Sequence, residues 1–395
     1  MRIYADNAAT TKMCRAAIDA MLLCMEEQYG NPSSLYSLGR RAKDILEGAR
    51  EEIAALIHAS PKEITFTSGG SEADNQALRS AAELGKKRGK THIISTAFEH
   101  HAILHTLKRL EREGFEVTLL PVHENGIVRP QELEAAIRED TCLVSVMYAN
   151  NEIGTIQPIR ELGAICKRRG VLFHTDAVQA MGHLPIDAEA DNIDLLSASG
   201  HKFHGPKGAG FLYARRGVRL SSLIEGGAQE RGKRAGTENV AAVAGMAAAL
   251  REAAANRERN AAHMSALRDR LIEGLREIPH AALNGDAKRR LPGNVNFCFE
   301  GVEGESLLLL LDERGICASS GSACASGSLD PSHVLLAIGR SYGVAHGSLR
   351  LSIGEDATEE EIACIIRNVK EVVEYLRGFS PVWRDLMDGK SGFIL

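Results

Sequence analysis

The chain has 395 residues, which is too long for one small core and predicts a large domain beside a smaller one. Hydrophobic residues make up 44% and charged residues 25%, the proportions of an ordinary soluble globular protein. The net charge of −5 gives no sign of a surface for nucleic acid or for acidic membranes. No apolar stretch is long enough to span a bilayer, and the first residues lack the apolar region of a signal peptide, so a cytoplasmic location is expected.

Eight cysteines are scattered through the chain. They are Cys14, Cys24, Cys142, Cys166, Cys298, Cys317, Cys324 and Cys364. No two of them form a CxxC pair, so their spacing fits neither a disulfide framework nor a zinc module. Most are expected to be small buried residues of a reduced protein, and no resident metal site is predicted. Cys324 differs because it lies in a run of small residues.

Short apolar runs alternate with helical patterns between residues 60 and 215. The predicted strands are residues 64–67, 92–96, 116–121, 141–147, 171–175, 194–198 and 208–213. The predicted helices between them include residues 71–87, 101–113, 130–139 and 158–169. This alternation predicts an α/β fold in which a mostly parallel seven-stranded sheet is covered by helices on both faces.

An alanine-rich stretch from Val240 to about Glu277 predicts a long helix that leaves the large domain. Beyond it, strands at 294–299 and 348–353 and helices at 305–313 and 358–377 predict a smaller α+β domain. We assign residues 12–250 to the large domain. Residues 1–11 and 251–395 are assigned to the small domain, which carries a loop at about residues 317–330.

An acid and a lysine follow two of the predicted strands. Asp176 comes directly after the run 171–175, and Lys202 follows the run 194–198 closely. An acid and a lysine at the ends of buried parallel strands are the two groups that a pyridoxal phosphate site needs. The lysine amine forms a Schiff base with the cofactor aldehyde, and the carboxylate keeps the pyridine nitrogen protonated. Two simpler interpretations stay open, in which Asp176 only caps the next helix and Lys202 is a solvated surface charge.

A glycine-containing turn at residues 67–75 follows a predicted strand and opens a helix. Glycines let backbone N–H groups converge, and a helix N-terminus favours a bound phosphate. The turn lacks the lysine of a P-loop and the spacing of a dinucleotide fingerprint, so ATP and NAD are poor candidates. A simple capping box formed by Ser71 and Asp74 is the alternative, and both interpretations can hold together.

Polar side chains follow two further strands at the same predicted edge of the sheet. His100 comes after the run 92–96, where an imidazole could stack on a cofactor ring and handle protons, although a surface histidine is the commoner case. Asn151 lies in the segment Asn150-Asn151-Glu152, which follows the run 141–147. Open α/β sheets bind their ligands at this edge.

Cys324 and Arg350 lie in the predicted small domain. Residues 319–327 are nearly all small, so they predict an exposed loop in which Cys324 is reachable and could act as a nucleophile; an incidental loop thiol is the alternative. Arg350 lies within a predicted strand, where its guanidinium needs a partner. A substrate carboxylate, bound by two parallel hydrogen bonds, would suit it.

With these motifs in place, the chain resembles the NifS/IscS-like cysteine desulfurases, which are fold-type I pyridoxal-phosphate enzymes of the class V aminotransferase family. The resemblance covers nearly the whole chain. It rests on residues 4–11, 30–34, 67–75, 148–154, 174–179, 199–202, 226–237, 319–327 and 348–354. So many ordered motifs make the resemblance far more specific than any one of them.

The resemblance implies a role for each matching residue. Lys202 would carry the cofactor, and His100 would stack on its ring and shuttle protons. Asp176 would pair with the ring nitrogen and Gln179 with the ring hydroxyl. The remaining cofactor and substrate contacts would come from Gly70, Ser71, Ser199 and His201 around the phosphate, and from Asn151 and Arg350 around the substrate. Thr237 would reach the phosphate of a neighbouring subunit, which implies a homodimer.

The implied reaction converts L-cysteine to L-alanine. The Cys324 thiolate would attack the substrate sulfur, keep it as a persulfide and pass it to an acceptor such as an iron–sulfur scaffold protein. In this family the long version of the loop goes with such a transfer, and Cys324 is a candidate transient ligand of an iron–sulfur cluster.

Two other kinds of function stay open at this stage. One is a selenocysteine lyase or another fold-type I lyase or aminotransferase, which would have no need of a nucleophilic thiol. The other is a non-catalytic iron–sulfur or zinc scaffold, against which the scattered cysteine spacing argues. The chain also departs from the resemblance at Ala8, where many relatives have asparagine, and at Tyr36, where histidine is common.

Overall fold

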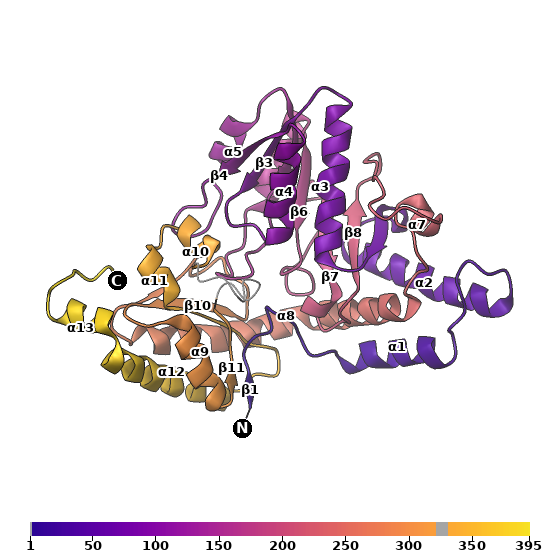
Figure 1. The fold of residues 1–395 in the computed structure, drawn as a ribbon. Coiled ribbons are helices and arrows are strands. Elements are labelled where there is room, and N and C mark those ends of the chain that lie inside the picture. The colour runs from indigo at the N-terminus through magenta and orange to yellow at the C-terminus, as the bar shows by residue number, and fades with distance from the viewer. Residues whose placement is uncertain (1, 321–330) are drawn as a thin grey trace.

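The computed structural model describes residues 2–320 and 331–395 and contains a central seven-stranded sheet (Figure 1). Its strand order is β2 (Ile64–Thr67), β8 (Gly210–Ala214), β7 (Leu195–Ser199), β6 (Leu172–Asp176), β5 (Thr141–Ser145), β3 (His92–Thr96) and β4 (Glu116–Leu120). Strand β8 is antiparallel to both neighbours, whereas the pairs from β7 to β4 are parallel. This arrangement confirms the predicted α/β fold.

Both faces of the central sheet are buried, because neighbouring residues of its strands point to opposite sides. Ile93 and Leu143 belong to one apolar cluster, while the next residues along the chain, Ile94 and Val144, belong to another. The first cluster is completed by helices α3 (Gly70–Lys86) and α4 (His101–Arg112). The second contains residues of α1 (Arg15–Glu26), α2 (Ser37–Leu56), α5 (Pro130–Ala136), α6 (Ile159–Arg169) and α8 (Val240–Arg276).

A smaller antiparallel sheet has a hydrophobic core of its own. Its strand order is β12 (Ser348–Ser352), β10 (Asn294–Phe299) and β9 (Ala281–Leu283), and helices α9 (Gly304–Glu313) and α12 (Glu359–Phe379) pack with it. Beside it, β1 (Ile3–Tyr4) pairs in parallel with β11 (Ile316–Cys317). The remaining helices are α7 (Gln229–Gly232), α10 (His333–Ala337), α11 (Tyr342–His346) and α13 (Pro381–Met387).

Helix α8 connects the two cores. Its first turns contribute Met246 and Leu250 to the core under the central sheet, and its last turns contribute Leu267 and Leu271 to the second core. Figure 1 shows the helix running beneath the central sheet toward the region of β10. The domain boundaries assigned from the sequence stay a prediction.

Helices α1 and α2 were not among the elements expected from the sequence pattern, and several predicted ends shift by one to three residues. Strand β6 extends to Asp176, so the acid is the last residue of the strand itself. Helix α5 ends at Ala136 because Ile137 has an extended backbone, with a ψ of 121°. In the described part of the chain, no helix is long and apolar enough to cross a membrane.

A buried ion pair joins α2 to α7. The Arg50 guanidinium donates to both carboxylate oxygens of Glu230, at 2.7 and 2.8 Å. Both side chains are 3% exposed, and the N–H of Phe66 in β2 donates to the same carboxylate at 2.9 Å. A buried pair with this geometry leaves a large penalty when one partner is removed.

The substitution Glu230→Ala is therefore expected to lower the free energy of unfolding by roughly 3 kcal/mol, because it removes the buried carboxylate that accepts two hydrogen bonds from Arg50 and leaves only the partly exposed Glu47, at 3.3 Å, as a counter-ion. Urea denaturation followed by circular dichroism measures this loss. The matched control is Asp19→Ala, which removes the partner of Arg15 in a pair whose side chains are 54% and 77% exposed, and should change stability little. Equal losses in the two variants would contradict the assignment.

Candidate active site

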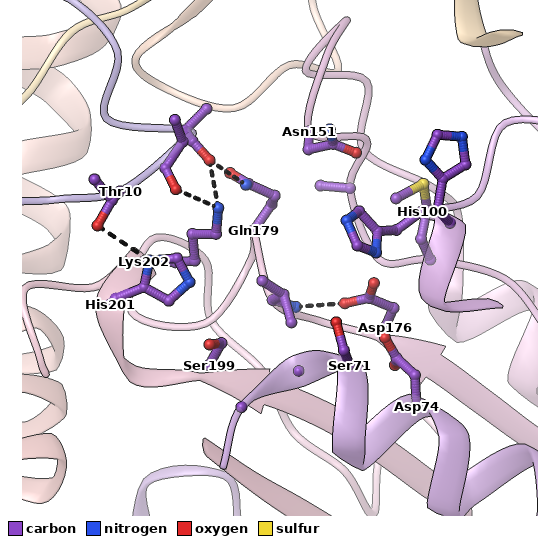
Figure 2. Close-up of a pocket in the computed structure, with 18 of the residues that line it drawn as sticks. Thr10, Ser71, Asp74, His100, Asn151, Asp176, Gln179, Ser199, His201 and Lys202 are labelled. Carbon is purple, nitrogen blue, oxygen red and sulfur yellow. Dashed lines mark hydrogen bonds between the residues drawn. The ribbon is translucent and has the colours of Figure 1, made fainter. Parts of the chain in front are cut away.

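A cavity of about 700 Å³ lies at the carboxyl ends of the parallel strands. Its lining comes from the turns that follow β2, β3, β5, β6 and β7, together with the N-terminal segment and β12. Of the residues predicted from the sequence, those that line it are Gly70, Ser71, His100, Asn151, Asp176, Gln179, Ser199, His201, Lys202 and Arg350 (Figure 2). The volume suits a small cofactor together with a small substrate.

Lys202 ends a 3₁₀ turn that directly follows β7. Its Nζ donates hydrogen bonds to the carbonyl oxygens of Ala8 and Ala9, at 2.7 and 2.8 Å. Figure 2 shows the side chain directed toward the N-terminal segment across one wall of the cavity. The amine is half-buried and held by backbone acceptors, so Lys202 is not a solvated surface charge.

Asp176 is the last residue of β6 and is 5% exposed. Burial raises the pKa of its carboxyl group to about 6, against the opposing effects of the Val178 N–H and the charge of Lys202. The Val178 N–H donates to Oδ1 at 2.9 Å, but the residues that follow form turns, so Asp176 does not cap a helix. Figure 2 shows Asp176 and Lys202 on opposite sides of the cavity, and at pH 7 the carboxyl group is mostly ionised.

The N-terminus of α3 borders the cavity through Gly69, Gly70 and Ser71. Gly69 has a φ of 152°, a conformation that side-chain-bearing residues rarely adopt. A Cβ on Gly70 would lie 2.6 Å from Cγ2 of Val178. No side chain caps the helix, which leaves its first N–H groups available to an anion.

The predicted capping box of Ser71 and Asp74 is wrong. The helix begins at Gly70 with Gly69 as its N-cap residue, whereas the box requires Ser71, two residues later, at the N-cap position. Asp74 is 1% exposed and extends from α3 toward the interior beside Asp176 (Figure 2). An S-x-x-D spacing therefore occurs here without the hydrogen bonds of the motif.

His100 is the N-cap residue of α4, and its Nδ1 accepts a hydrogen bond from the N–H of Ala102 at 3.1 Å. Burial lowers the pKa of the imidazole, and the nearby charge of Lys202 lowers it further. The ring is consequently neutral at pH 7 while it borders the cavity. This placement excludes the interpretation of His100 as an ordinary surface histidine.

The N-terminal segment forms a wall of the cavity that the sequence pattern did not predict. The Gln179 side chain donates to the carbonyl of Ala8 at 2.9 Å, and Nδ1 of His201 lies 3.1 Å from the hydroxyl of Thr10. Burial lowers the pKa of His201 to about 4. The family resemblance of residues 4–11 was the available signal, but it carried no indication of which strand ends the segment would meet.

Arg350 lies in β12 and is 2% exposed. One guanidinium nitrogen lies 2.8 Å from Oδ1 of Asp6, another donates to the backbone carbonyl of Asn151 at 3.1 Å, and Nε has no partner among the described residues. Asp6 thus orients Arg350 at the edge of the cavity. Sequence reasoning missed this contact, because the two residues are 344 positions apart.

Two further residues of the lining were also missed. Glu152 follows Asn151, and burial raises the pKa of its carboxyl group to about 7, while the Ser332 hydroxyl donates to it. His333 in α10 stacks on His101 with ring centroids 4.8 Å apart, and its Nε2 lies 2.9 Å from the carbonyl of Glu99. The turn after β5 is therefore joined to the start of α10.

Not every predicted residue is placed in the cavity. Thr237 is exposed in the loop before α8 and is not part of the lining. Cys324 lies outside the described residues. Of the two departures from the resemblance, Ala8 lines the cavity, whereas Tyr36 is 61% exposed at the N-cap position of α2.

The groups around the cavity fit pyridoxal phosphate. An amine at Lys202 can bind an aldehyde, a buried carboxylate at Asp176 can pair with a ring nitrogen, and the uncapped N-terminus of α3 can hold a phosphate. A residue larger than glycine at position 70 would collide with Val178. Glycine at such a position is typical of sites where a ligand approaches the backbone closely. Fold and cavity together define an enzyme of the fold-type I pyridoxal-phosphate class.

Comparisons with known proteins agree with this class. The Aminotransferase class-V family matches residues 3–365. The chain is 53% identical over 393 residues to "Cysteine desulfurase IscS" of Clostridium botulinum strain Hall, and the match covers 99% of each chain. It is also 53% identical over 380 residues to the protein of that name from Methanosarcina thermophila, and this match covers 96% of this chain and 94% of that one. A solved NifS-like protein superimposes with a TM-score of 0.89 at 40% identity, covering 95% of this chain and 100% of that one.

The chain belongs to the class V aminotransferase family, in its NifS/IscS-like group of cysteine desulfurases. Membership implies pyridoxal phosphate as the cofactor. A further solved relative is "SspA in complex with cysteine", with a TM-score of 0.78 at 34% identity, covering 91% of this chain and 100% of that one.

The substitution Gly70→Ala is expected to weaken pyridoxal phosphate binding by about tenfold, because the added Cβ pushes the first N–H groups of α3 away from the phosphate and loses a hydrogen bond to a charged group. Absorbance titration of the apoprotein with the cofactor measures the affinity. The control is Gly48→Ala in α2, where an added Cβ meets nothing within 4 Å. Unchanged affinity in the Gly70 variant would remove α3 from the phosphate site.

Proposed function

We propose that this cysteine desulfurase takes the sulfur of L-cysteine as a persulfide on Cys324, releases L-alanine and supplies the sulfur for iron–sulfur cluster assembly. The observation that supports this proposal best is the placement of Lys202 and Asp176 on opposite sides of one cavity, with the N-terminus of α3 beside them. The family relationship supports the choice of L-cysteine as the substrate.

Each wall of the cavity has its own part in the proposed reaction. Pyridoxal phosphate, when bound, withdraws electrons from the bonds around the α-carbon of an amino acid. Lys202 binds the cofactor through its amine, which lies in a wall made of Ala8 and Ala9. Asp176 remains mostly ionised above pH 6, so it stabilises a proton on the ring nitrogen.

The phosphate would be held by Gly70, Ser71, Ser199 and His201, which border the same part of the cavity. His201 is neutral at pH 7 because of its lowered pKa, so it acts as a hydrogen-bonding group rather than as a counter-ion. In a homodimer, Thr237 of a second copy would add a hydroxyl donor; its exposure on a loop is compatible with such a contact.

Substrate binding is assigned to Arg350 and Asn151. Arg350 borders the cavity, and Asp6 and the backbone carbonyl of Asn151 hold its guanidinium there, which suits it to bind a substrate carboxylate. His100, neutral and bordering the cavity, is suited to take and return protons near the α-carbon.

The sulfur step balances without an external oxidant. The Cys324 thiolate attacks the substrate sulfur, a sulfur–sulfur bond forms, and the carbon–sulfur bond breaks. The electron pair of the broken bond stays with the β-carbon. This carbon takes up a proton and becomes the methyl group of L-alanine, which is then released. The transferred sulfur is oxidised to the sulfane level as the carbon is reduced.

The cellular setting belongs to the same proposal. We infer a cytoplasmic homodimer whose sulfur acceptor is an iron–sulfur scaffold protein. We assign residues 12–250 to a large domain and residues 1–11 and 251–395 to a small domain; the two hydrophobic cores support two domains, although Val334 and Leu335 of α10 pack in the first core.

The substitution Cys324→Ala is expected to reduce sulfide release from L-cysteine with dithiothreitol by at least about 100-fold, because it removes the attacking thiolate. The visible absorbance of the bound cofactor should persist, since Cys324 does not hold it. Cys364→Ala, which removes a half-buried thiol of α12, should keep full activity. Full activity of the Cys324 variant would favour a lyase or aminotransferase without a nucleophilic thiol.

The attachment site can be tested without turnover. The purified protein should be yellow, and borohydride should bleach it and leave a pyridoxyl group on the peptide that contains Lys202, as peptide mass spectrometry would show. The Lys202→Ala protein should acquire no such label. A colourless protein that contains iron or zinc would instead support the scaffold function.

A further inference from the structure

Three buried carboxyl groups gather beneath the cavity. Asp74 of α3 is 1% exposed, Asp176 of β6 is 5% exposed, and Glu99, just before α4, is not exposed at all. Three ionised carboxylates cannot share so small a region of low dielectric, because burial and mutual repulsion both disfavour the charged form. The proposed function uses only Asp176.

Among the residues that the structure describes, no cation neutralises Asp74. The only basic nitrogen within 4 Å of its carboxylate in the described residues is Nε2 of His174, at 3.7 Å. Burial lowers the pKa of His174 to about 3, so this imidazole is neutral. Its two nitrogens lie 2.9 and 3.1 Å from the hydroxyls of Ser145 and Ser197. Oδ1 of Asp74 has no hydrogen-bond partner in the described part of the chain.

The charges around the pair decide where a proton goes. Burial raises the pKa of Asp74 well above its usual range, and the charge of the neighbouring Asp176 raises it further. Glu99 raises this pKa as well, whereas a hydrogen bond with the Ser197 side chain lowers it. Lys202 lowers the pKa of Asp176 instead. Glu99 also favours its neutral form, since burial raises its pKa to about 8, and His100 is neutral. Asp74 therefore holds the proton, and Asp176 carries the charge.

We propose that Asp74 is a positioning residue of the cofactor site, which remains protonated and donates a hydrogen bond to the Asp176 carboxylate. The pair then carries one negative charge rather than two, and this charge lies on Asp176, on the cavity side of the pair (Figure 2). A donor behind Asp176 also fixes the orientation of its carboxylate toward a ring nitrogen. The inference rests on the proposed function for the role of Asp176, but its first test does not involve turnover.

The first experiment measures the melting temperature of the full-length apoprotein between pH 5 and 9. A carboxyl group whose pKa is raised by folding contributes stability that is complete below its unfolded pKa of about 4 and is lost as pH rises through the folded value. Histidines whose pKa is lowered by folding add stability as pH rises, and they do so in the wild type and the variants alike, so the contribution of Asp74 is measured as a difference: relative to a variant without this carboxyl group, the wild type should lose stability as pH rises. Asp74→Asn should show a smaller loss, by the equivalent of about one proton.

The matched control is Asp191→Asn. Asp191 is another aspartate of low exposure, at 7%, but it has an arginine partner, since Arg160 donates to it at 3.0 Å. This variant should melt below the wild type at pH 8, because it removes the carboxylate of an ion pair. Asp74→Asn should melt at or above the wild-type temperature at pH 8. If it melts as low as the control, with an unchanged pH slope, the proposal is overturned.

The second experiment separates the proton of Asp74 from its bulk. Pyridoxine 5′-phosphate binds through its ring and phosphate but has no aldehyde for Lys202. An asparagine can donate to Asp176 as a protonated acid does, whereas an alanine cannot. Asp74→Asn should therefore bind within about twofold of the wild type and Asp74→Ala about tenfold more weakly. Equal affinities of the two variants would show that no donated hydrogen bond is involved.

If the Asp74 variants do not fold, a measurement on the wild-type protein still tests whether Asp74 is protonated. Infrared spectroscopy of apoprotein labelled with carboxyl-¹³C aspartate should show a protonated aspartate at pH 7.5, where Asp176 is mostly ionised. Absence of that band would refute the proposal. Desulfurase activity enters none of these measurements, so a failed proposed function and a failed role for Asp74 give different results.

Discussion

The carboxylate of Asp176 is the group on which the rest of the site depends. It lies at the end of a strand that is buried on both faces, where an ionised acid is stable only if neighbouring groups compensate its lost hydration. The N–H of Val178 and the charge of Lys202 favour ionisation, while burial opposes it. The balance raises the pKa of this carboxyl group to about 6, so the group is still mostly charged at neutral pH.

The central sheet explains why these groups meet. Parallel strands place their carboxyl ends at one edge, so the acid at the end of β6, the lysine after β7 and the helix after β2 converge although the chain separates them widely. The N-terminal segment closes the cavity from the other side. Its backbone carbonyls hold Lys202, while Asp6 pairs with Arg350 of β12. The cavity is thus shared between elements that pack on the two hydrophobic cores.

Much of the fold could be predicted because its strands are short apolar runs with little ambiguity. The predicted strands at 64–67, 92–96 and 294–299 coincide with β2, β3 and β10. Asp176 and Lys202 could be singled out from their positions after such runs, and the resemblance extended the set to Gln179, Ser199 and His201. The capping box at Ser71 was wrong because spacing alone cannot distinguish an acid that caps a helix from one that packs beneath it.

Local pattern therefore established the order of strands and helices, the class of fold and the residue types at each strand end, because hydrophobic periodicity and turn residues act over a few neighbours. The tertiary structure decided which of these strand ends share a cavity and which of the side chains there are ionised. Asp6 and Arg350, or Asp74 and Asp176, come together only when distant segments pack, and a carboxyl group acquires its shifted pKa only from the burial and charges that this packing creates.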